Sequence, residues 1–151
     1  MAKRGDKKMY KILIVDSDIM TYDLIKIKLN PQYYKIFSAL HGAIALDIIE
    51  KYSFDCVIVD LNVAHVNGLE IIDLLQVWDT YRPWIIATCQ QNNPDSDYPW
   101  LDLATSMGAD EILTKPYHME QLLDLFPASL TKAQNHYVDL PVHNEQLHRG
   151  V

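Results

Sequence analysis

Short apolar runs and amphipathic segments alternate along the chain between residues 11 and 126. Five runs rich in β-branched residues predict buried strands. They cover residues 11–15, 33–38, 55–60, 84–89 and 111–115. Spacings of three and four between apolar residues predict a helix after each strand. These helices cover residues 18–30, 41–52, 69–79, 100–107 and 119–126. Strict alternation favours parallel pairing, so we predict an α/β fold, a doubly wound five-stranded parallel sheet with helices on both faces.

This pattern defines one domain with an extension at each end. A length of 151 residues suits a single domain. We therefore predict a basic, disordered leader over 1–9, one domain over 10–126, and a C-terminal tail or linker over 127–151, where no apolar periodicity is seen. Residues 90–99 have the composition of a loop that is long for a compact domain.

Composition excludes several classes of protein. The longest apolar runs fall well short of the roughly 20 residues that a membrane span needs, and no secretory segment is present. We therefore expect no membrane partner and a cytoplasmic location. Cys56 and Cys89 lack the spacing of a disulfide framework or a zinc site. The formal net charge is −7 although the first residues are basic, which disfavours direct nucleic-acid binding by the folded part.

Candidate chemistry lies where the predicted strands end. Asp16, Asp60, Thr88 and Lys115 come at the ends of four of these runs. Ligands of open α/β sheets bind at the carboxyl ends of the strands. Two carboxylates, a hydroxyl and an ammonium group suit a phosphoryl group with a divalent cation, because Mg²⁺ prefers oxygen ligands and the other two groups bind phosphoryl oxygens.

The segments around these residues resemble a response-regulator receiver domain of two-component phosphorelay signalling, over residues 10–126. The resemblance rests on VIVDLNVAHVNGLE around Asp60, on IIATC at Thr88 and on GADEILTKP, which ends in the Lys115 and proline pair. Gly68 stands eight residues after Asp60, as in the family. The resemblance implies a flavodoxin-like, chemotaxis-regulator-like fold. It also implies that Asp60 is the phosphoacceptor, Thr88 the switch hydroxyl and Lys115 the lysine that binds the phosphoryl group.

The same resemblance implies a cofactor and partners. Asp16, Asp60 and the backbone carbonyl of Asn62 match the positions that bind Mg²⁺. The phosphoryl donor is expected to be a sensor histidine kinase or a histidine phosphotransfer protein, and the output an unknown downstream protein, with a homodimer as a further option. Such a domain is a phosphoacceptor with self-catalysed transfer and slow autodephosphorylation, not an enzyme.

Two departures from the family pattern affect the site and its output. Ser17 replaces the second acidic residue after the first strand, which removes one charge and is expected to weaken Mg²⁺ binding. Asp18, one position later, is a candidate to compensate through water or a shifted loop. Ile112 replaces the usual aromatic residue three positions before Lys115. We therefore expect any output to involve the 90–99 loop or the helix over 100–107.

Two alternatives remain open at this point. The first is a degenerate pseudo-receiver, a protein-interaction module of the same fold that is never phosphorylated. The second is a haloacid-dehalogenase-type phosphatase, because Asp16, Ser17 and Asp18 resemble its Asp-x-Asp motif. The second alternative lacks a late acidic metal-binding motif and leaves the spacing from Asp60 to Gly68 unexplained.

Overall fold

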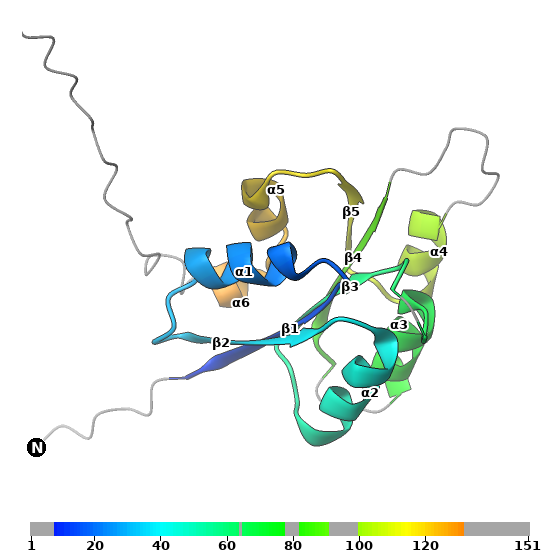
Figure 1. Cartoon of the computed structure of the whole chain (residues 1–151), viewed down its shortest axis with the longest axis horizontal. Helices are drawn as coiled ribbons and strands as arrows, with labels where there is room; N and C mark the ends of the chain where they lie inside the picture. The colour runs from blue at the N-terminus through cyan, green and yellow to red at the C-terminus, as the bar shows by residue number, and fades with distance from the viewer. Residues whose placement is uncertain (1–7, 64, 78–81, 91–99, 132–151) are drawn as a thin grey trace, which may run out of the picture.

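The computed structural model describes residues 8–63, 65–77, 82–90 and 100–131. In these residues a parallel five-stranded sheet of order β2-β1-β3-β4-β5 lies between two layers of helices (Figure 1). The strands are β1 (Tyr10–Val15), β2 (Tyr34–Ala39), β3 (Cys56–Asp60), β4 (Trp84–Gln90) and β5 (Glu111–Lys115). The helices are α1 (Ile19–Lys28), α2 (Gly42–Lys51), α3 (Gly68–Val77), α4 (Trp100–Met107), α5 (Met119–Asp124) and α6 (Ala128–Thr131). The predicted fold is confirmed.

Successive residues of a strand point to opposite faces, and the central strands are apolar on both. Leu13 and Val15 of β1 pack with α2, α3 and α4 on one face of the sheet. Ile12 and Ile14 of the same strand pack with α1, α5 and α6 on the other. Figure 1 shows these two groups of helices on opposite sides of the sheet. The sheet is thus covered on both faces, and its carboxyl edge stays accessible.

The ends of the elements follow local capping. Asp18 caps α1 by accepting a hydrogen bond from the Met20 N–H, so the helix begins one residue later than predicted. His41 caps α2 in the same way through the Ile44 N–H. Of the predicted helix over 69–79, residues 78 and 79 lie outside the described part of the chain.

Packed structure continues past Pro127, contrary to the predicted start of the tail. Helix α6 follows this proline, and its Leu130 is fully buried. The Tyr34 hydroxyl donates a hydrogen bond of 2.8 Å to the Leu130 carbonyl. Four residues are too few to show helical periodicity, which is why the sequence pattern missed this helix. The rest of the predicted tail, 132–151, and most of the predicted leader, 1–7, lie outside the described residues.

Cys56 and Cys89 are both buried free thiols. Among the described residues, no helix is long and apolar enough to cross a membrane.

Candidate functional site

The carboxyl edge of the sheet brings the four predicted strand-end residues together. Asp16 directly follows β1, Asp60 ends β3 and pairs in register with Thr88 of β4, and Lys115 ends β5. Asp16 and Asp60 are only 3% and 5% exposed. The sheet therefore holds two carboxylates almost entirely out of water, at the edge where open α/β sheets bind ligands.

One lysine bridges the two carboxylates. The Lys115 Nζ atom lies 2.8 Å from Asp16 Oδ2 and 3.0 Å from Asp60 Oδ2. Burial lowers the pKa of Lys115, but its hydrogen bonds to Asp16 and Asp60 outweigh burial and raise the pKa above its ordinary value. Lys115 is therefore charged at neutral pH. Two carboxylates facing one ammonium leave a net negative charge, which favours a cation at this edge.

Asp16 is held by three donors. Its Oδ1 accepts the Asp18 N–H at 2.9 Å. Its Oδ2 accepts the Thr21 hydroxyl at 3.1 Å in addition to Lys115. Sequence reasoning missed Thr21, which is buried in α1, and the only signal for it was a hydroxyl at a core-facing position of the helix that follows the acid.

Asp60 is fixed by its own loop and by the start of α3. Its Oδ1 accepts the Asn62 N–H at 2.9 Å. A Cβ atom on Gly68 would lie 2.7 Å from the Asp60 carbonyl oxygen and 2.7 Å from the Leu61 Cα. Only glycine lets α3 begin this close to the end of β3. This contact is the physical reason for the eight-residue spacing between Asp60 and Gly68.

Thr88 differs from its neighbours in having no hydrogen-bond partner. It is 1% exposed, and its Oγ1 is the one buried side-chain nitrogen or oxygen in the described part of the chain that lacks a partner. A buried unsatisfied hydroxyl costs about 1–3 kcal/mol. Thr88 pairs with Asp60 across the sheet, so this unpaired hydroxyl belongs to the strand position next to that carboxylate.

The donor set at this edge fits a small, hard cation. Asp16, Asp60 and the Asn62 carbonyl offer oxygen ligands, and Mg²⁺ is commonly bound by one or two carboxylates together with water. In the described residues no group of three or more His, Cys, Asp and Glu side chains is placed to hold a metal. Ser17 is exposed, and Asp18 uses Oδ1 to cap α1. The site thus has two carboxylates to offer.

A hollow of about 580 Å³ opens beside the site, between α1 and the segment after β5. Lys115 lines it together with apolar side chains that include Met20, Leu24, Tyr117 and Met119. It therefore joins the charged site to an apolar surface.

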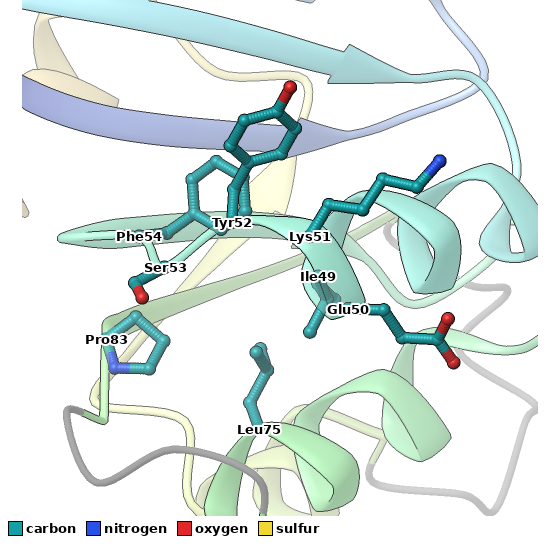
Figure 2. Close-up of a pocket in the computed structure, with 8 residues that line it drawn as sticks. All are labelled: Ile49, Glu50, Lys51, Tyr52, Ser53, Phe54, Leu75 and Pro83. Atoms are coloured by element: carbon teal, nitrogen blue, oxygen red, sulfur yellow. The ribbon is translucent and has the colours of Figure 1, made fainter.

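A second hollow lies at the opposite edge, where Phe54 precedes β3 and Pro83 precedes β4 (Figure 2). Glu50 and Lys51 carry their charged ends away from Leu75 and Pro83 in this view. Because its charged groups do not converge, this hollow is a weaker candidate for a functional site than the carboxyl edge.

Of the elements expected to carry the output, α4 is described, whereas residues 91–99 lie outside the described part. Ile112 on β5 is 37% exposed. The side chain that replaces the usual aromatic residue therefore adds to the apolar surface beside α4.

Known proteins resemble the chain in sequence and in fold. A probable transcriptional regulatory protein of Picosynechococcus is 27% identical over 131 residues, which cover 82% of this chain and 50% of that protein. The cell cycle transcriptional regulator CtrA of Caulobacter vibrioides is 21% identical, with 83% of this chain and 52% of that protein covered. The chain spans about half the length of these curated relatives.

Among solved structures, the chemotaxis response regulator CheY4 of Vibrio cholerae matches with a TM-score of 0.65 and 25% identity, covering 83% of this chain and 99% of that one. The model of the family described as the response regulator receiver domain matches residues 12–126. Receiver domains typically bind a divalent cation, and the family implies a histidine kinase as partner. The chain belongs to the response regulator receiver domain family, whose members are signalling phosphoacceptors of two-component signal transduction.

Proposed function

We propose that the chain accepts a phosphoryl group on Asp60 from a phosphohistidine of a partner protein, with Mg²⁺ as cofactor. The observation that carries this proposal is the sharing of Lys115 between two buried carboxylates, Asp16 and Asp60, beside the unpaired hydroxyl of Thr88. A solved response regulator of Burkholderia pseudomallei, 21% identical with a TM-score of 0.65, is described with a phosphorylated aspartic acid and a calcium ion. That likeness supports the fold, and the chemistry is argued from the residues of this chain.

The transfer is a displacement at phosphorus. An Asp60 carboxylate oxygen attacks the phosphorus, the P–N bond to the partner's imidazole breaks, and its electron pair stays on the imidazole nitrogen, which takes up a proton. The product is an acyl phosphate on Asp60. Lys115 pairs with a phosphoryl oxygen, and the Asn62 N–H holds the carboxylate in place. Bound at Asp16, Asp60 and the Asn62 carbonyl, Mg²⁺ supplies positive charge where two anions meet.

The switch follows from the new charge on Asp60. A phosphoryl group adds a charge of about −1.5 to −2 and three acceptor oxygens. The Thr88 hydroxyl, buried without a partner, gains an acceptor when it turns toward the phosphoryl group. Lys115 is drawn the same way, so the carboxyl ends of β4 and β5 shift together. The output surface is then the α4 side of the sheet, where Ile112 is exposed.

The partner is proposed to dock over α1. Four large apolar side chains of this helix are exposed, and two of them, Met20 and Leu24, line the hollow at Lys115. The four are Ile19, Met20, Leu24 and Ile27, exposed by 45%, 54%, 42% and 56%. Because the phosphohistidine must reach Asp60, the partner has to cover this edge, and an exposed apolar surface beside it is suited to contact.

The chemistry is tested without knowledge of the partner. Intact-mass analysis of the native chain after incubation with a small acyl-phosphate donor and Mg²⁺ is expected to show one added phosphoryl group, which Asp60→Asn removes. Absence of any addition, together with absence of Mg²⁺ binding, contradicts the proposal. That result favours the alternative of a pseudo-receiver that acts through constitutive protein contacts.

The docking surface is tested with the kinase that transfers fastest among the purified sensor kinases of the same organism. Leu24→Glu is expected to slow transfer from this kinase about tenfold, the change that corresponds to about 1.4 kcal/mol, and to leave uptake from the small donor unchanged. Val77→Glu is the matched control, because Val77 is an exposed apolar residue on α3. Equal rates for the two variants would place the docking surface elsewhere.

A further inference from the structure

One hydroxyl of α1 reaches from the apolar hollow into the site. Thr21 is 8% exposed, and its Oγ1 donates to Asp16 Oδ2 at 3.1 Å. Thr21 belongs to α1 and also lines the hollow beside the site. Its hydroxyl therefore ties α1 to Asp16 at the end of β1.

The contacts of Asp16 show why the Thr21 hydroxyl matters for the site. Lys115 holds Asp16 and Asp60 at once, with Nζ distances of 2.8 and 3.0 Å. When a phosphoryl group on Asp60 draws the ammonium toward itself, Asp16 loses its only ion pair in the described part of the chain while it stays almost fully buried. The contacts that remain are the Asp18 N–H on Oδ1 and the Thr21 hydroxyl on Oδ2. Only the second of these is a side chain that directs Oδ2.

We propose that Thr21 is a positioning residue that keeps the Asp16 carboxylate turned into the site while Lys115 changes partner. This inference deepens the proposed function and rests on it. Ser17 leaves Asp16 as the one acidic side chain at the end of β1 that is buried in the site. The orientation of Asp16 therefore has a larger effect on cation binding here than in a site with two such acids. Polar partners of metal ligands typically change metal affinity 10- to 100-fold when they are removed.

The test uses two Thr21 variants of the full chain. Thr21→Val keeps the shape of the side chain and removes the hydroxyl, and Thr21→Ser keeps the hydroxyl. Each is also combined with Lys115→Met, which removes the ammonium that otherwise holds Asp16. Thr105→Val is the matched control, because the Thr105 hydroxyl donates to the Leu101 carbonyl on the exposed surface of α4. Thermal unfolding checks that every variant is folded before any binding is compared.

Two readouts separate this inference from the proposed function. In metal-free crystals of the variants combined with Lys115→Met, the Asp16 carboxylate is expected to keep its orientation with Thr21→Ser and to turn away with Thr21→Val. In Mg²⁺ titrations followed by amide chemical shifts, Thr21→Val alone is expected to weaken binding about tenfold, and Thr21→Ser and Thr105→Val little.

Each outcome bears on one of the two proposals. An unchanged Asp16 orientation when Thr21→Val is combined with Lys115→Met overturns the positioning role, whether or not the chain binds Mg²⁺. Native Mg²⁺ affinity in Thr21→Val overturns it as well. If the native chain binds no Mg²⁺ but Asp16 turns away when Thr21→Val is combined with Lys115→Met, the positioning of Asp16 stands and the proposed cofactor fails.

Discussion

Acidic side chains lie at both edges of the sheet, but they are bonded in different ways. At the amino edge, Asp110 accepts the Ile85 N–H at 2.8 Å and pairs with Arg82 at 2.9 Å. The Asp110 carboxylate thus has all its partners within the fold. At the carboxyl edge, Asp16 and Asp60 share Lys115, and the Thr88 hydroxyl beside them has no partner.

The difference shows which edge is built for a ligand. A carboxylate that is paired with its own cation and a backbone N–H has its bonding capacity used within the fold. Two buried carboxylates with one cation keep surplus charge and free lone pairs, which lowers stability unless something binds them. Substitutions at the amino edge should therefore lower stability and leave phosphorylation intact. Substitutions at the carboxyl edge that remove surplus negative charge should raise stability and impair phosphorylation.

The largest effect is expected from Lys115→Met, which removes the shared cation. Asp16 and Asp60 are then left as buried like charges, and breaking a buried ion pair in this way costs about 3 kcal/mol. Urea unfolding without metal measures this loss, and intact-mass analysis is expected to show loss of phosphoryl uptake. Native stability in this variant would mean that the ion pairs contribute little to the fold.

Asp110→Ala should destabilise the fold by about 2 kcal/mol, because it leaves the Ile85 N–H without its acceptor and Arg82 without its ion pair. Urea unfolding gives the magnitude. At a temperature where the variant is folded, its phosphoryl uptake should match that of the native chain. Loss of uptake in the folded variant would break the contrast between the two edges.

Asp60→Asn should raise the free energy of unfolding by about 1 kcal/mol in metal-free buffer, since it leaves one buried carboxylate for one ammonium. The same substitution abolishes phosphoryl uptake. A gain in stability together with a loss of phosphoryl uptake would show that Asp60 is kept for function and not for the fold. A clear loss of stability in this variant would argue that Asp60 is structural.

Thr88→Val has the smallest expected effect on stability, between no change and a gain of about 1 kcal/mol, because it removes a buried hydroxyl that has no partner. Uptake from the small donor should persist, but the chemical-shift changes that phosphorylation causes in β4 and α4 should shrink. Retention of the full set of shift changes would remove Thr88 from the switch.

The sequence predicts the strands and the strand-end residues well because both depend on local patterns. Asp16, Asp60 and Lys115 follow apolar runs, and parallel pairing brings such positions to one edge. Thr21 was missed because its role depends on how the first turns of α1 lie against Asp16, which no spacing along the chain encodes. The buried position of Leu130 was missed because α6 is too short to show a period.

The central claim, that Asp60 is the phosphoacceptor, is tested most directly by locating the added phosphoryl group. After incubation with the small acyl-phosphate donor and Mg²⁺, borohydride reduction converts an aspartyl phosphate to homoserine, and peptide mass spectrometry finds the position. Homoserine is expected at position 60 alone. Homoserine in place of Asp16 or Asp18, or an unmodified peptide from a chain that binds Mg²⁺, would contradict it.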